Sequence, residues 1–196
     1  MDQSNGYEAV ADEFLAGRGS RTRSTAIGVE EVRKWARALP RGSRVIDLGC
    51  GPGLPITAAL LEEELHVFGV DAAPSLVASF RRNFPDTPIL CESVLESRLF
   101  DRTFDAVLAW GLMFLLKAED QRRLMRRFAE ILVPGGQLLF TSPAQLVVWT
   151  DAMTGLESLS LGAEEYKKQL DVVGISVANE YEDVGENHYF ETFKRK

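Results

Sequence analysis

The sequence predicts an α/β fold of the Rossmann-like type, with a mostly parallel sheet and helices on both of its faces. From about residue 28 to the C-terminus, helical and extended patterns alternate, which is typical of β-α-β units around such a sheet. A glycine-rich turn at 49–53 (Gly-Cys-Gly-Pro-Gly) follows a short apolar run and precedes a predicted helix. Glycines in this place let the backbone turn tightly and approach a bound ligand.

The first half of this region is predicted to contain three helices and three strands. The first helix places Val32 and Trp35 on one face and stops at Pro40, because proline breaks a helix interior. Pro55 and Pro74 open the next two helices, since the first turn has no intrahelical partner for the N–H that proline lacks. The three strands are expected at 44–48, 67–70 and 89–91.

The second half is predicted to contain two helices and four extended segments. One helix ends in a Pro-Gly-Gly turn at 133–136, and another is expected at 163–173. Residues 143–161 show no clear periodicity. The extended segments are expected at 104–109, 137–141, 174–182 and 187–194. A turn at 183–186 joins the last two as a hairpin.

Composition and charge favour one globular domain that acts on a small molecule. The chain has 196 residues, of which 45% are hydrophobic and 26% charged, so a single domain is the default expectation. A net charge of −7 disfavours nucleic acid as a partner, because non-specific binding needs many basic side chains. One basic cluster is interpreted as the solvated face of an amphipathic helix. It contains Arg122, Arg123, Arg126 and Arg127.

We expect a cytoplasmic protein without a membrane partner, either a monomer or a homodimer. The longest apolar run, 106–116, has about half of the ~20 residues that a membrane-spanning helix needs. The N-terminus has neither the basic nor the apolar region of a secretory signal. The two cysteines, Cys50 and Cys91, do not make a disulfide framework and suit a reducing compartment.

Three acidic residues lie at the ends of predicted strands, where open α/β sheets bind their ligands. Asp47 precedes the glycine turn, Asp71 ends the second strand, and Glu92 ends the third. Asp71 is placed to accept hydrogen bonds from two ribose hydroxyls. Glu92 is placed to accept one from an adenine amino group, with the backbone of Ser93 and Val94 at the edge of the ring. A nucleoside ligand is therefore expected.

The glycine turn departs from the dinucleotide-binding fingerprint. That fingerprint, G-x-G-x-x-G, requires a third glycine at position 54, where this chain has Leu54. A diphosphate also gains little from an acid at position 47, whereas an ammonium group can be held there by charge or through a bridging water. These features disfavour a nicotinamide-dependent oxidoreductase, which stays as the less favoured alternative.

In order and spacing, four segments resemble the successive motifs of class I S-adenosylmethionine-dependent methyltransferases, especially their small-molecule branch. These segments are 45–53, 70–71, 104–107 and 132–136. The resemblance extends over about residues 28–194 and implies a seven-stranded sheet with an antiparallel last strand. It implies S-adenosylmethionine as cofactor and S-adenosylhomocysteine as product. It also implies that Asp47 and the glycines lie near the methionine moiety, Asp71 at the ribose and Glu92 near adenine.

The resemblance also implies that the segment 109–113 lines the cofactor. The residues expected to bind it are Tyr7, Asp47, Gly49, Cys50, Gly51, Asp71, Ala72, Glu92, Ser93, Val94, Ala109 and Trp110. We expect methyl transfer to a small molecule, achieved mainly by proximity and orientation. His188, at the start of the last predicted strand, is the candidate catalytic base, with a surface residue as the alternative.

Other methyl acceptors are less favoured. The segment after the fourth strand lacks the Asn/Asp-Pro-Pro-Tyr/Phe motif of amino-methylating enzymes that act on adenine or glutamine. Neither cysteine follows a proline, as cytosine methylation would require. A protein or RNA methyltransferase and an inactive cofactor-binding protein stay as alternatives. No metal site is expected.

Residues 1–27 precede the predicted methyltransferase domain, 28–196, and are expected to form a lid or cap, with a frayed terminus as the alternative. In the resembled family such a segment often folds over the cofactor, and Tyr7 is then placed at its methionine end. Arg18 or Arg23 is a candidate to meet an anionic acceptor. The expected walls of an apolar acceptor pocket are Trp110, Met113, Phe114, Trp149 and Met153, with ordinary core packing as the alternative for Trp110 and Phe114.

Overall fold

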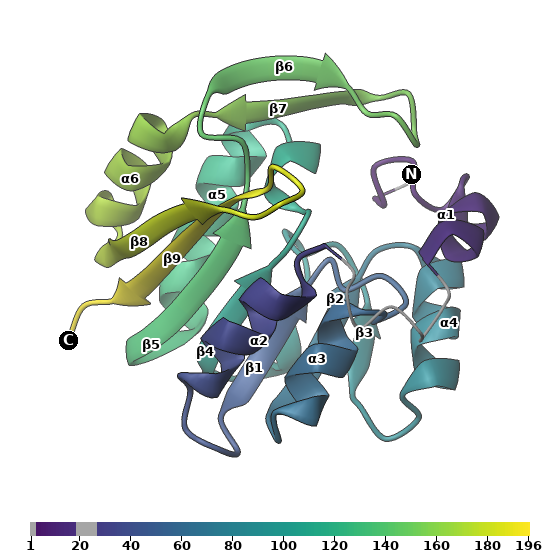
Figure 1. Ribbon diagram of the computed structural model, residues 1–196, viewed down its shortest axis with the longest axis horizontal. Helices are drawn as coiled ribbons and strands as arrows, with labels where there is room; N and C mark the ends of the chain where they lie inside the picture. The colour runs from purple at the N-terminus through teal and green to yellow at the C-terminus, as the bar shows by residue number, and fades with distance from the viewer. Residues whose placement is uncertain (1–2, 19–26) are drawn as a thin grey trace.

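The computed structural model describes residues 3–18 and 27–196. Seven strands form one sheet in the order β3-β2-β1-β4-β5-β9-β8 (Figure 1). Their bounds are β1 Arg44–Leu48, β2 His66–Asp71, β3 Ile89–Cys91, β4 Phe104–Ala109, β5 Leu132–Thr141, β8 Ile175–Glu182 and β9 His188–Lys194. Strands β1 to β5 pair in parallel, and β9 runs antiparallel to β5 and β8. The predicted fold class, with its antiparallel last strand, is confirmed.

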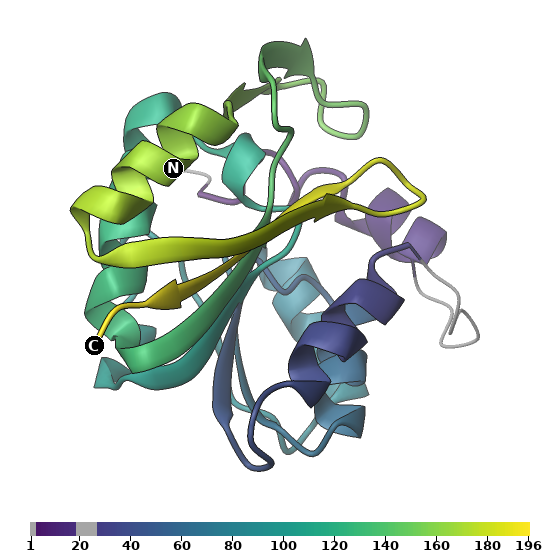
Figure 2. The same ribbon diagram turned by 60° about the vertical axis from the view of Figure 1, so that its left-hand side comes forward.

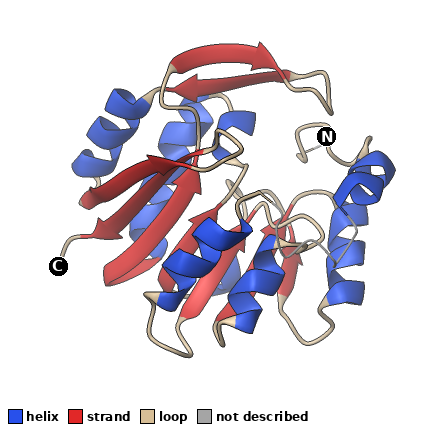
Figure 3. Cartoon of the chain, viewed as in Figure 1, coloured by secondary structure: helices blue, strands red, loops and turns tan. Residues whose placement is uncertain are grey.

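Helices pack against both faces of this sheet (Figures 2 and 3). Their bounds are α2 Val29–Arg37, α3 Ile56–Glu62, α4 Pro74–Asn83, α5 Ala118–Ile131 and α6 Ala163–Val172, with short 3-10 turns η1 Leu99–Asp101 and η2 Met113–Leu115. Neighbouring side chains of a strand point to opposite faces. Val45 therefore lies in one apolar layer with α2 and α3, whereas Ile46 lies in the other with α5 and α6. None of the helices in the described ranges is long and apolar enough to cross a membrane.

Strand β5 begins earlier than the sequence predicts. The expected turn at 133–136 lies inside the strand as an irregularity, because Phe104 pairs with Leu132 whereas Ala106 pairs with Gln137. A β-carbon at Gly136 would lie 2.9 Å from the carbonyl oxygen of Val133. The glycine therefore permits a close backbone approach in a segment that leaves and rejoins the sheet.

A hairpin without a sequence prediction occupies the segment that lacks periodicity. Strands β6 Leu146–Thr150 and β7 Glu157–Leu161 pair antiparallel in a separate two-stranded sheet. It stands apart from the main sheet, at the top of Figures 1 and 2. Leu146 and Val148 are 78% and 59% exposed. A strand whose apolar residues face solvent lacks the alternation by which half-buried strands are found in a sequence.

The N-terminal segment packs on the rest of the domain through helix α1, Ala11–Arg18. Ala11 is buried against Ala73 and Leu76 at the start of α4, and Tyr7 and Phe14 pack on the same cluster. In Figure 1 this segment lies beside α4, next to the turn of the β6–β7 hairpin.

Candidate cofactor and acceptor site

A cavity of about 250 Å³ lies where the carboxyl ends of β1, β2 and β4 meet. Its lining comes from the glycine turn, the segments after β2, β3 and β4, the N-terminal segment, the β6–β7 hairpin and the residue before β9. Of the residues predicted to bind a cofactor, it contains Tyr7, Asp47, Gly49, Cys50, Gly51, Asp71, Ala72, Ser93, Val94 and Trp110. The parallel sheet brings these residues together because its strands end at one edge.

The glycine turn is fixed by hydrogen bonds to β2 and by close packing beneath it. The N–H of Gly49 donates to the carbonyl of Val70 at 2.8 Å. Gly53 has a φ of +77°, and a β-carbon there would lie 2.5 Å from the ring of Phe84. Only glycine tolerates both the left-handed backbone conformation and the lack of room for a side chain. The turn therefore presents bare backbone to the cavity.

Asp71 joins this turn to the start of α4. Its Oδ2 accepts a hydrogen bond of 2.8 Å from the N–H of Gly51, and its Oδ1 accepts one of 2.9 Å from the N–H of Ala73. Burial raises the pKa of Asp71, and the two backbone bonds only partly offset this effect. A carboxylate has about four lone-pair sites. Asp71 can thus hold the backbone and still accept bonds from the hydroxyls of a ligand.

Asp47 is a buried acid beside the turn, with 2% of its surface exposed. Its Oδ2 accepts a hydrogen bond of 2.6 Å from the Thr57 hydroxyl. Burial raises the pKa of Asp47 to about 7, the Thr57 bond lowers it, and the charge of Asp71 raises it further. Among the described residues it has no cationic partner. An ammonium group in the cavity would supply one.

A partly buried chain of hydrogen bonds links the segment after β4 to the β8–β9 hairpin. The Nε1–H of Trp110 donates to the hydroxyl of Tyr189 at 3.0 Å, and that hydroxyl donates to Oδ2 of Asp183 at 2.9 Å. Asn187 donates through Nδ2 to both carboxylate oxygens of Asp183. Burial is the main cause of a raised pKa for Tyr189. The chain therefore holds Trp110 and Asn187, which both line the cavity, in fixed positions.

The N-terminal segment is attached at two points and covers one side of the cavity. Both oxygens of the Glu8 carboxylate accept hydrogen bonds from Ser75, at 2.9 Å from its N–H and 2.7 Å from its hydroxyl. A β-carbon at Gly6 would lie 3.0 Å from Leu156 of the hairpin. The hydroxyl of Tyr7 donates to Asp151 of the same hairpin at 3.5 Å. The N-terminal segment and the hairpin thus meet across the cavity.

Asp151 is a cavity residue that the sequence interpretation missed. It is 9% exposed and lies between β6 and β7. Its Oδ1 accepts bonds from the N–H of Met153 and from both the N–H and the hydroxyl of Thr154. An Asp with Thr-Gly three residues later, as in 151–155, is a turn signal. That signal could have located the hairpin turn, although not its place over the cavity.

Aromatic rings line the cavity beyond the polar groups. Trp110 and Phe114 face it, as predicted for an acceptor pocket. The ring of Trp149 packs against Phe114 with centroids 5.4 Å apart, so it supports the wall from behind. Met113 is fully buried in the core, and Met153 is not part of the lining.

Residues 45–136 match a family model described as a methyltransferase domain. Over these residues the predicted resemblance to S-adenosylmethionine-dependent methyltransferases is confirmed. The match covers the glycine turn, the end of β2 and the strand β4, which are the segments that build the cavity.

Relatives of this chain differ in the acceptors that their names give. Aklanonic acid methyltransferase DauC of Streptomyces sp. (strain C5) is 32% identical over 152 residues, 73% of this chain and 63% of DauC. A probable tRNA methyltransferase 9B of Bos taurus is 27% identical over 151 residues, 70% of this chain and 32% of that protein. The matches thus span less than two thirds of either relative.

The fold is shared with solved methyltransferase structures. The structure of S-adenosylmethionine-bound CalS10, an amino pentose methyltransferase from Micromonospora echinaspora, matches with a TM-score of 0.72 at 19% identity. The match covers 93% of this chain and 96% of CalS10.

Two predicted cofactor residues do not line the cavity. Glu92 is exposed, and its backbone N–H donates to the carbonyl of Asp71. The next residue, Ser93, faces the cavity instead. Neighbouring side chains of extended backbone point in opposite directions, so a shift of one residue changes the face. Ala109 is fully buried at the end of β4.

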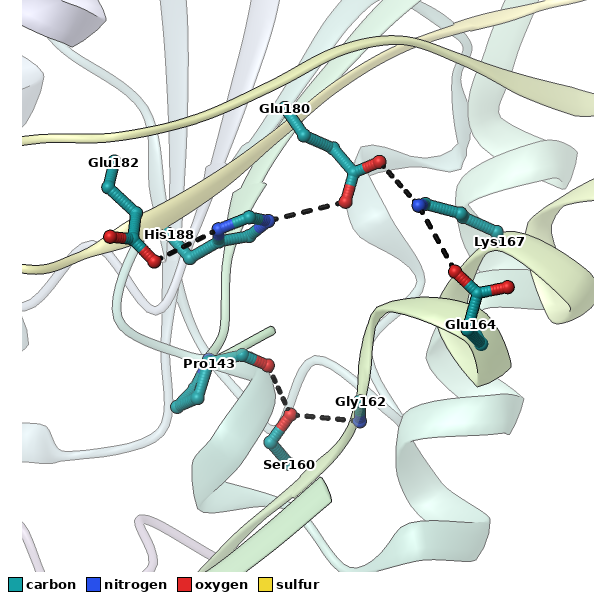
Figure 4. A network of polar contacts seen from close by, with 8 residues as sticks. All are labelled: Pro143, Ser160, Gly162, Glu164, Lys167, Glu180, Glu182 and His188. Atoms are coloured by element: carbon teal, nitrogen blue, oxygen red, sulfur yellow. Dashed lines mark hydrogen bonds and ion pairs between the residues drawn. The ribbon is translucent and has the colours of Figure 1, made fainter. Parts of the chain in front are cut away.

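The structure does not bring His188 to the cavity either. Its Nε2 lies 3.3 Å from a carboxylate oxygen of Glu180, and its Nδ1 lies 3.5 Å from one of Glu182 (Figure 4). Lys167 of α6 pairs with Glu180 at 2.7 Å. His188 therefore faces α6, whereas the preceding Asn187 lines the cavity.

The remaining predictions concern cations. The side chain of Arg18 and the whole of Arg23 lie outside the described residues. Across the ranges 3–18 and 27–196, no group of three or more His, Cys, Asp or Glu residues is arranged to hold a metal.

Proposed function

We propose that this chain transfers a methyl group from S-adenosylmethionine to a small-molecule acceptor. One observation carries the proposal: a single cavity joins the glycine turn to two buried carboxylates, Asp47 and Asp71, at the ends of adjacent parallel strands. The match of residues 45–136 to the methyltransferase domain supports it. So do the names of DauC and CalS10, which are small-molecule methyltransferases.

The cavity residues fit S-adenosylmethionine better than a dinucleotide. In this proposal Asp71 accepts hydrogen bonds from the ribose, Asp47 faces the ammonium group, and Ser93 and Val94 lie along the adenine edge. Among the described lining residues there is no Lys, Arg or His. A diphosphate would therefore meet carboxylates where it needs cations.

The residues of the chain act by binding and orientation. The cofactor, when bound, supplies a methyl group activated by a positively charged sulfur. Holding an acceptor in line with such a group can contribute about 7 to 11 kcal/mol to lowering the barrier. The aromatic wall around Trp110 and Phe114 positions the acceptor, and residues 3–18 act as a lid that excludes water.

Three relatives named probable tRNA methyltransferase 9B favour a competing function, methylation of RNA. The net charge of −7 opposes RNA binding. In addition, three of the four arginines on α5 already make contacts within the protein. Arg122 and Arg123 form ion pairs with glutamates, and Arg127 donates to backbone carbonyls. Phosphate binding would have to compete with these contacts.

A product-release assay tests the proposal. The protein is incubated with S-adenosylmethionine and either a pool of small metabolites with hydroxyl, amino and thiol groups or total tRNA. S-adenosylhomocysteine is then quantified. We expect its release with the small-molecule pool and its loss in an Asp71→Ala variant. Release with tRNA alone would contradict the proposed acceptor class.

A further inference from the structure

The charged side chains of the described cavity lining all carry negative charge. Three carboxylates, those of Asp47, Asp71 and Asp151, belong to the described lining, and no cationic side chain does. In the proposed function, Asp47 and Asp71 serve the cofactor. Asp151 is left on the hairpin side, opposite the sheet, where an acceptor would enter.

Asp151 is held in place by one oxygen and presents the other to the cavity side. Its Oδ1 takes all three bonds from the hairpin turn, at 2.8 to 3.0 Å. Its Oδ2 takes the Tyr7 hydroxyl at 3.5 Å, which is at the limit of a hydrogen bond. A ligand donor can therefore approach Oδ2 without breaking the turn.

Asn187 adds a second acceptor of hydrogen bonds to the lining. Both of its side-chain bonds to Asp183 use Nδ2, at 3.1 and 2.9 Å. The carbonyl end of the amide is then the end that can meet a ligand. Asp151 and Asn187 thus both present oxygen atoms that can accept a hydrogen bond from a ligand.

We infer that the methyl acceptor is a neutral or positively charged molecule that donates a hydrogen bond to Asp151, and not an anion. This inference rests on the proposed function and names the substrate class of its acceptor side. The aromatic wall of Trp110 and Phe114 fits an acceptor with an apolar or aromatic body. The one net positive charge of S-adenosylmethionine does not balance three carboxylates, so an anion would enter a negative cavity.

Binding of three phenols of similar size tests this inference. Tyramine carries an ammonium, 4-ethylphenol is neutral, and 4-hydroxyphenylacetate carries a carboxylate. Each is titrated calorimetrically at pH 8 into protein saturated with S-adenosylhomocysteine. We expect tyramine and 4-ethylphenol to bind at least about tenfold more tightly than 4-hydroxyphenylacetate, because the acidic lining repels the carboxylate of that probe.

An Asp151→Asn variant isolates the charge. The amide oxygen of Asn can still accept the bonds from Met153 and Thr154, so the hairpin turn is kept. In this variant we expect tyramine to lose its advantage over 4-hydroxyphenylacetate to within about threefold. Glu157→Gln is the matched control, because Glu157 is an exposed acid of the same hairpin and does not line the cavity. It should keep the preference of the unmodified protein.

Two results overturn the inference. One is failure of the unmodified protein to discriminate against the carboxylate probe, and the other is an unchanged preference in Asp151→Asn. Titration of S-adenosylhomocysteine alone comes first and separates the two proposals. If the nucleoside does not bind, the proposed function fails. If it binds and the probes are not discriminated, only the acceptor class fails.

Discussion

Asp71 uses both carboxylate oxygens to hold the backbone around the proposed ribose site. Replacing Asp71 with Ala removes these bonds together with the acceptor for the ribose hydroxyls. A charge-assisted bond contributes about 1.5 to 3 kcal/mol, so we expect the Kd for S-adenosylmethionine to rise about ten- to a hundredfold. Calorimetry measures it, with Asp86→Ala as the control because Asp86 is exposed outside the cavity. Equal affinity of both variants would remove Asp71 from the site.

Asp47 makes the stability of the ligand-free protein depend on pH. Burial raises its pKa from the ordinary value of 3.8 to about 7. The folded state therefore holds a proton that the unfolded state releases between these values. The protonated carboxyl of Asp47 therefore stabilises the folded state. This contribution is complete below pH 3.8 and is lost as the pH rises through 7. The cost of ionising Asp47 has an upper limit of about 4 kcal/mol at pH 8.

An Asp47→Asn variant should remove this cost. Urea unfolding is expected to show a free energy of unfolding roughly 1 to 4 kcal/mol above that of the unmodified protein at pH 8, and a much smaller difference near pH 4.5. Asp105→Asn is the control of opposite sign. Burial raises the pKa of Asp105, but bonds from Arg44 outweigh it and the net shift is downward. A pH-independent gain in Asp47→Asn would show that Asp47 does not titrate as described.

Residue-scale prediction from sequence works where a motif fixes the backbone. Asp47 and Asp71 are found because the strand, turn and helix around them leave little freedom. Glu92 and His188 are each one position away from a residue that lines the cavity, Ser93 and Asn187. The face of a residue next to a strand end depends on how the chain leaves the sheet, and the sequence pattern does not contain that information.

At the scale of elements, the N-terminal segment and the β6–β7 hairpin line the cavity from outside the sheet. Glu8 attaches the first of them to α4 through two bonds to Ser75. A Glu8→Ala variant should release this attachment, so we expect faster cleavage of residues 3–18 by protease and a several-fold weaker Kd for S-adenosylhomocysteine. Glu13→Ala is the matched control, because Glu13 is an exposed acid of α1. Cleavage at the same rate in both variants would contradict a lid held by Glu8.

The elements that the sequence predicts well are those buried in the sheet. Strands β1 and β4 are covered on both faces and read as apolar runs, so their bounds agree closely with the prediction. The hairpin is different, because Leu146 and Val148 face solvent and its inner side carries the buried hydroxyls of Ser158 and Ser160. Its fold depends on tertiary contacts with Tyr166 and Pro143, which lie outside any local pattern.

At the scale of the whole molecule, the strand order places the ends of β1, β2 and β4 side by side under one cavity. Sequence similarity to a known family predicts the seven strands and the antiparallel β9, although not their order. Periodicity alone predicts only alternating strands and helices. The strand order matters for function because it decides which loops line the cavity. These loops in turn decide which charged side chains a bound ligand contacts.

Calorimetric titration of the unmodified protein with S-adenosylmethionine and with NADH tests the central claim most directly. The cavity offers carboxylates to an ammonium and a ribose and no described cation to a diphosphate. We therefore predict saturable one-to-one binding of S-adenosylmethionine and no measurable heat of binding with NADH. Binding of NADH, without binding of S-adenosylmethionine, would contradict it.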